Sequence, residues 1–116
     1  MAPKDLPASV QQLIRQHFSS ATDVDALLLL RRDRRAWTAS TLARELRMNV
    51  DQARAVLTRL QRSGLLRTVD DTYRFDPRDP QLAGATAALA QLYPAYRVAV
   101  ISLIYGRPTG AISDFS

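Results

Sequence analysis

Apolar and polar residues recur between positions 49 and 65 with the period of an α-helix. Four apolar residues at positions i, i+3, i+4 and i+7 share one stripe: Ala53, Val56, Leu57 and Leu60. Asn49 is a preferred residue at a helix start, and Gln52, three positions later, can bond back to the Asn49 amide. Gly64 supplies a left-handed residue at which the chain can leave the helix. The pattern therefore predicts one helix from Asn49 to Leu65, with one buried stripe and one that faces solvent.

Two amphipathic segments at the start of the chain also have helical spacing. Residues 7–18 begin with a proline suited to a first helical position, and the apolar face continues through Val10, Leu13, Ile14, His17 and Phe18. A second helix is predicted from Val24 to Arg32, capped by Thr22 or Asp23, with four consecutive leucines at the centre of the core. The basic run at 31–35 closes this helix, as expected at the negative end of its dipole.

A third, shorter helix is predicted from Thr41 to Arg47, with Thr38 or Ser40 as its cap. Residues 36–38 are a possible short strand before it. Its tryptophan, Trp37, is expected to anchor the core or the neighbouring hairpin, because large aromatic side chains are usually buried.

Two short segments rich in β-forming residues flank a pair of aspartates. Leu65–Val69 and Thr72–Phe75, joined by Asp70 and Asp71, predict a two-stranded hairpin with a tight turn. The prolines at positions 77 and 80 end it, because proline cannot donate to a strand ladder.

The segment from Gln81 to Tyr105 is helical in character and apolar on more than one side. Pro94 is expected to kink the helix or divide it in two. A membrane span is rejected, because an arginine in its middle, Arg97, would be costly in hydrocarbon. We expect its spare apolar face to pack against a second subunit, and residues 109–116 to be disordered.

Composition and charge narrow the class of protein. A chain of 116 residues suffices for one core, and the absence of cysteine fits a reducing compartment. The first residues lack the apolar core of an export signal, so we expect a cytoplasmic protein. The net charge is +5, and residues 36–64 carry most of the excess, with five arginines against two acids. A basic excess on the capped helix and its neighbour favours a polyanionic partner.

No arrangement of residues indicates catalysis. His17 is the sole histidine and stands near the apolar face of the first helix, where isolated histidines usually serve packing. The sequence has no glycine-rich phosphate loop, no cysteine nucleophile and no zinc-ligand spacing. We therefore expect no enzyme, no cofactor and no metal.

The order helix, short helix, capped helix and hairpin, with Thr41-Leu42-Ala43-Arg44-Glu45-Leu46 and then Leu60-Gln61-Arg62-Ser63-Gly64-Leu65-Leu66, resembles the bacterial winged-helix transcriptional regulators of the MarR type. The likeness covers Val24 to Phe75. It implies a mainly α fold with a small hairpin wing, flanked by N- and C-terminal dimerisation helices. The corresponding units are residues 1–22, the winged helix-turn-helix at 23–76, a C-terminal helix or kinked pair at 77–105, and a tail at 106–116.

The resemblance further implies a homodimer with Asn49 to Ser63 in the DNA major groove and the wing, Arg67 to Arg74, near the minor groove. Arg54 is suited to guanine edges and Gln52 to adenine, whereas basic side chains further along the helix suit phosphates. The expected DNA-binding residues are Thr38, Ser40, Gln52, Arg54, Thr58, Arg59, Arg62, Arg67 and Arg74. The expected dimer interface consists of Leu13, Phe18, Leu89, Leu92, Tyr96, Val100, Ile101 and Ile104.

Two acidic features oppose DNA binding. Asp51 lies in the first turn of the capped helix, and Asp70 and Asp71 lie at the wing tip, where the family usually has basic residues. Carboxylates at these places repel phosphates. The alternative is a winged-helix interaction module that binds a regulatory or signalling protein through its acidic wing or its apolar C-terminal helix.

Overall fold

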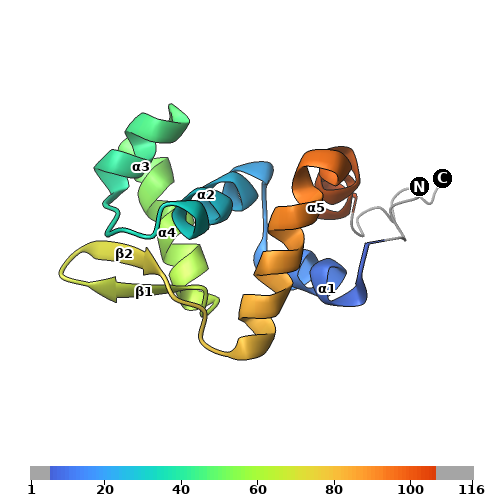
Figure 1. Ribbon diagram of the computed structural model, residues 1–116. Helices are drawn as coiled ribbons and strands as arrows, with labels where there is room; N and C mark the ends of the chain where they lie inside the picture. The colour runs from blue at the N-terminus through green and yellow to red at the C-terminus, as the bar shows by residue number, and fades with distance from the viewer. Residues whose placement is uncertain (1–5, 107–116) are drawn as a thin grey trace.

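The computed structural model describes residues 6–106, in which a hairpin separates four helices from a fifth (Figure 1). In chain order the elements are α1 (Ala8–His17), α2 (Ala21–Arg32), α3 (Ala39–Leu46), α4 (Val50–Arg62), β1 (Leu66–Val69), β2 (Thr72–Phe75) and α5 (Pro80–Tyr105). This order is compatible with a winged helix. The predicted disordered segment, and the tail beyond residue 106, lie outside the described residues.

The helix predicted around position 56 is confirmed as α4, with both predicted ends. Asn49 Oδ1 accepts a hydrogen bond from Gln52 N at 2.8 Å, and Gln52 Oε1 accepts one from Asn49 N at 3.4 Å. Gly64 adopts a φ of 83°, the left-handed conformation expected after the helix. All four residues of the predicted stripe are buried. The local sequence therefore specifies both the length of α4 and the side that it buries.

The start of α2 corrects a prediction. The helix begins at Ala21, three residues before the predicted Val24, and its N-cap residue is Ser20, whose side chain makes no capping bond. Neither Thr22 nor Asp23 caps it. Asp23 lies inside the first turn with a fully buried carboxylate, because groups from outside the helix bind it.

The hairpin pairs β1 with β2 in antiparallel register around two left-handed aspartates, Asp70 and Asp71. Positive φ at both central residues is typical of the tight turns that match the twist of a hairpin. Trp37 forms a single bridge to Tyr73, with backbone bonds of 2.8 and 2.7 Å, so the predicted short strand is reduced to one residue. Trp37 is completely buried, as predicted for an anchor of the core and the wing.

Helix α5 is one long helix with a break, as its internal proline predicted. Tyr96, two residues after Pro94, has non-helical φ and ψ. Asp79 caps its start by accepting a hydrogen bond from Leu82 N at 2.9 Å, and near its end Tyr105 Oη accepts one from Ala21 N at 3.0 Å. The helix packs mainly against α1 (Figure 1).

A polar cluster joins the middle of α5 to α2. Tyr93 Oη donates to Asp25 Oδ1 at 3.2 Å and accepts from Arg97 Nη1 at 2.8 Å. Arg97 also lies 3.6 Å from the same carboxylate oxygen of Asp25. Burial raises the pKa of the Tyr93 hydroxyl, and the negative charge of Asp25 raises it further. Arg97 therefore helps to hold α5 against α2 within the single chain.

The predicted dimer face is largely used within one chain. Five of its residues are buried in the core: Leu13, Phe18, Leu89, Val100 and Ile104. Helix α5 contacts the chain's own α1 and α2, and these side chains belong to the core that the three helices share. Leu92, Tyr96 and Ile101 remain partly exposed. The large apolar residues left most open on α5 are Val98, 79% exposed, and Tyr105, 60% exposed.

By length and composition alone, α5 is apolar enough to cross a membrane, and 22% of its most apolar window is buried. An ion pair joins Arg97 of this helix to Asp25 of α2. These contacts make α5 part of a globular fold.

Candidate nucleic-acid interface

The side of α4 opposite its buried stripe presents a row of polar residues. Arg54, Thr58 and Arg62 recur every four positions, and both arginines are exposed while Thr58 is partly covered. Gln52 is also exposed; its side-chain oxygen is used in the capping box, which leaves its amide hydrogens for another partner. The chain's own segments therefore leave most of this row open.

Arg54 shares the first turns of the row with an acid. Its Nη1 lies 3.3 Å from Asp51 Oδ1, and the two side chains are 59% and 97% exposed. An exposed pair of this kind contributes at most about 1 kcal/mol. Arg54 can therefore exchange this partner for another at little cost.

Arg59, predicted as a phosphate ligand, is 43% exposed and pairs with an acid of its own chain. Its Nη2 donates to Asp23 Oδ1 at 2.7 Å and its Nε to Asp23 Oδ2 at 3.4 Å. Asp23 is fully buried and also accepts bonds from the amide and hydroxyl of Ser19, at 2.8 and 3.0 Å. A buried carboxylate needs such partners, so Arg59 fastens α4 to the corner between α1 and α2. The helical pattern could not reveal a partner 36 residues away.

Helix α3 precedes α4 and adds basic groups that sequence reasoning did not select. Thr38 forms a capping box with Thr41, so its hydroxyl serves the helix rather than an open surface. Ser40, the other predicted cap and DNA contact, lies inside α3 and is exposed. Arg44 and Arg47 are also exposed, and their place in the basic segment 36–64 was the available signal.

The hairpin has a basic stem and an acidic tip. Arg67 and Arg74 are direct partners in the register, so both side chains leave the same face of the hairpin. Both arginines are exposed, and Arg67 Nε lies 3.3 Å from Asp76 Oδ2. The opposite face carries Leu66 and Phe75, which pack on the core. The exposed Asp70 and Asp71 project beyond this stem.

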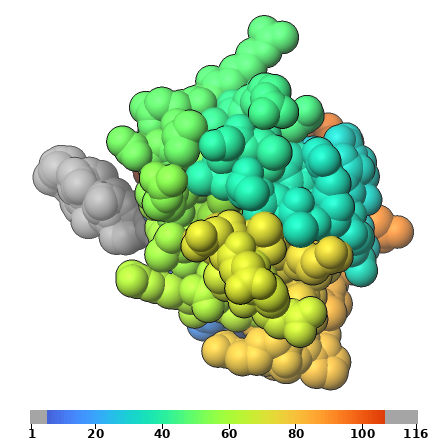
Figure 2. Space-filling model, turned by 90° about the vertical axis from the view of Figure 1, so that its left-hand side faces the viewer, coloured from blue at the N-terminus to red at the C-terminus, as the bar shows by residue number. Residues whose placement is uncertain are grey.

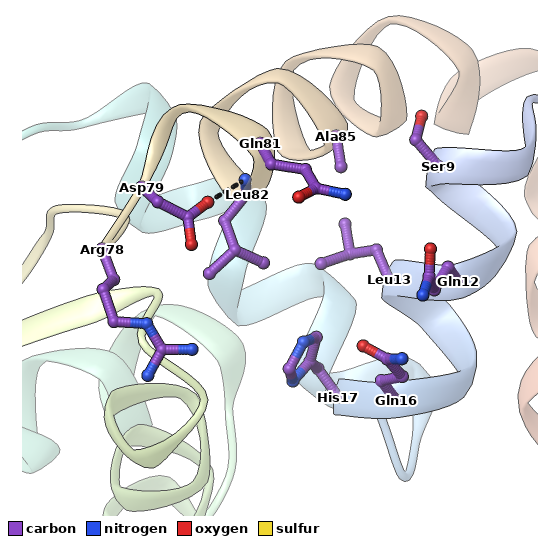
Figure 3. Close-up of a pocket in the computed structure, with 10 residues that line it drawn as sticks. All are labelled: Ser9, Gln12, Leu13, Gln16, His17, Arg78, Asp79, Gln81, Leu82 and Ala85. Carbon is purple, nitrogen blue, oxygen red and sulfur yellow. Dashed lines mark hydrogen bonds between the residues drawn. The ribbon is translucent and has the colours of Figure 1, made fainter.

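A pocket of about 240 Å³ lies between α1 and the start of α5 (Figure 3). His17 lines it and is only partly buried, so it is not the core packing residue that the sequence predicted. Burial lowers the pKa of the His17 imidazole, and the positive charge of nearby Arg78 lowers it further. Within residues 6–106, no group of three His, Asp or Glu side chains has the arrangement of a metal site.

The comparisons with known proteins add no relative. No family model matches the chain, and neither a curated protein nor a solved structure shows significant similarity to it. The functional argument therefore depends on the geometry of this chain.

Proposed function

We propose that this protein is a sequence-specific DNA-binding transcriptional regulator that acts as a homodimer on a pseudo-palindromic site. The observation that carries the proposal is the open arginine row on α4, a helix capped at its start and packed by its opposite side. Exposed arginines on α3 and on the hairpin stem extend the positive surface around it. Such a concentration of arginine on one helix and its neighbours favours a polyanion.

The reading residues follow from the chemistry of base edges. Arg54 is suited to the two acceptors of guanine and Gln52 to adenine, whereas Arg62 is suited to a phosphate. The short helix α3 contributes Ser40, Arg44 and Arg47 to the backbone contacts. Arg59 takes no part, because the buried Asp23 holds it.

The wing contributes through its stem. The aspartates at the tip repel phosphates, so the hairpin approaches DNA with Arg67 and Arg74 and keeps its tip away from the backbone. This arrangement reduces the minor-groove contact of the wing and leaves α4 as the main reading element.

In this proposal the exposed apolar residues of α5 form the dimer contact. Val98 and Tyr105, with the partly exposed Leu92, Tyr96 and Ile101, form the surface available to a second copy. A two-fold axis there would present two α4 helices about 34 Å apart, one turn of the duplex. The protein would act in the cytoplasm, which suits its lack of cysteine.

The test is a fluorescence-anisotropy titration with a mixed-sequence duplex at about 50 and 200 mM salt. We expect affinity to fall steeply with salt, because phosphate contacts release counterions. Arg62→Gln should bind every duplex on the order of tenfold more weakly, since it removes one phosphate contact. Arg54→Ala should also blur base preference when bound fragments are selected from random duplexes. Arg15→Gln, which removes the same charge from an exposed position on α1, is the matched control and should bind as the parent does.

A second candidate function is an interaction module for a regulatory protein. The exposed Asp70 and Asp71 at the wing tip, and the exposed Val98 on α5, favour it. A weak signal with no dependence on salt in the titration above would support this candidate and remove DNA binding.

A further inference from the structure

The end of α2 and the segment that joins it to α3 carry a concentrated positive charge. Four arginines and one aspartate occupy positions 31–35. Arg31 and Arg32 lie in the last turn of α2, where the helix dipole favours a cation. Arg34 and Arg35 come after the end of the helix, so the dipole does not account for them.

Both guanidinium groups are held in place by aromatic rings. The Arg34 guanidinium lies 4.9 Å from the centre of the Phe75 ring, and that of Arg35 lies 4.1 Å from the Trp37 ring. Arg34 Nε also donates to the Arg31 carbonyl oxygen at 2.9 Å. A guanidinium stacked by its flat face keeps the donors at its rim for another partner. Both groups are thus ordered before anything binds them.

Neither group is neutralised by the protein. Asp33 lies nearest in sequence, and its carboxylate is 3.7 Å from Arg32 Nη2. In the part of the chain that the structure describes, no carboxylate lies within 4.0 Å of the Arg34 or Arg35 guanidinium. Exposed guanidinium groups that are held in place and have no acidic partner are common ligands of phosphate in proteins.

The segment is attached to the hairpin. Trp37 exchanges backbone hydrogen bonds of 2.8 and 2.7 Å with Tyr73, and its indole Nε1 donates to the Asp33 carbonyl oxygen at 3.0 Å. Phe75, beneath Arg34, belongs to β2. Figure 2 shows the turquoise α2–α3 segment, the green α3 and the yellow hairpin together on one face of the molecule. A duplex lying along this face would meet the segment beside the wing.

We propose that Arg34 and Arg35 form a second phosphate-binding site for double-stranded DNA, on the opposite side of the hairpin from α4. The inference rests on the proposed function and extends its footprint to the outer edge of the wing. The two positive charges also offset the repulsion between phosphates and the acidic wing tip, because they lie beside the same hairpin. Arg34 and Arg35 bind backbone phosphates, so they add affinity for every sequence alike.

The experiment measures how DNA affinity depends on salt in Arg34→Gln/Arg35→Gln. Each phosphate contact contributes about 0.9 to the slope of log affinity against log salt. The double variant removes two contacts from each subunit and four from the dimer, so we expect a slope shallower by about 3.6. Arg34→Lys/Arg35→Lys should restore most of it. Arg15→Gln, at an exposed position on α1, is the control and should leave the slope unchanged. Thermal unfolding of each variant, without DNA, separates loss of fold from loss of contact.

The outcomes distinguish this inference from the proposed function. If the parent protein binds no DNA, the proposed function fails and this inference with it. If the parent and Arg34→Gln/Arg35→Gln share one slope while Arg62→Gln has a shallower one, α4 binds DNA and the second site does not exist. A lower melting temperature with an unchanged slope would likewise overturn the inference, because it would show that the two arginines only stabilise the hairpin.

Discussion

Arg59 and Arg62 lie three positions apart on α4 and have opposite surroundings. Both side chains reach solvent, but Arg59, 43% exposed, pairs with a fully buried carboxylate, whereas Arg62 makes no ion pair with a described residue. Both residues are arginines of the same helix, and the helical period places both away from the buried stripe. What separates them is Asp23, which comes from a different helix. A charged side chain on this helix is therefore available to a ligand only where no buried acid of the same chain pairs with it.

The largest test of this contrast is stability. Arg59→Ala should lower the free energy of unfolding by about 2–3 kcal/mol, because it leaves Asp23 buried with only the Ser19 donors. Arg62→Ala should change it by less than about 0.5 kcal/mol, as expected of an exposed residue. Urea denaturation measures both. Equal stability of the two variants would show that the Asp23 pair makes no net contribution and would remove the distinction.

A smaller change in stability is expected at the end of α4, where a contact from a distant part of the chain again decides the result. Gly64→Ala should cost about 1–2 kcal/mol, because its φ of 83° strains any residue with a Cβ. The added Cβ would also lie 3.0 Å from Arg78 Cζ, a contact that distant sequence supplies. The control is Gly84→Ala in α5, where nothing lies within 4 Å and a gain of about 0.5–1 kcal/mol is expected. Destabilisation of similar size in both variants would contradict this account.

Much of the fold could be predicted because it is encoded locally. The ends of α4, the capping box with Gln52, the hairpin around Asp70 and the break after Pro94 all follow from residues within four positions of one another. The start of α2 was missed because Asp23 looks like a cap, yet its partner Arg59 lies far along the chain. The same limit applies to the predicted dimer residues, five of which are buried within the single chain. Apolar spacing shows that a face is buried, but not whether its own chain or another covers it.

The candidate site was predictable in part. The exposed Arg54 and Arg62 follow from helical period, whereas the pairing of Arg59 with Asp23 depends on tertiary contact. The ring-stacked Arg34 and Arg35 were overlooked because a basic run after a helix has an ordinary explanation in the helix dipole. Their closeness to Trp37 in the sequence could have indicated a ring contact. Only the pairing of Trp37 with β2 shows that this contact lies beside the hairpin.

The most direct test of DNA recognition by α4 is a map of backbone amide shifts in ¹⁵N-labelled protein as a duplex is added. We predict that the largest changes fall on Gln52, Arg54 and Arg62, with smaller ones along the hairpin stem and little at Val98. Changes confined to the acidic wing tip and the exposed part of α5, or none at a duplex excess over protein, would contradict DNA recognition by α4.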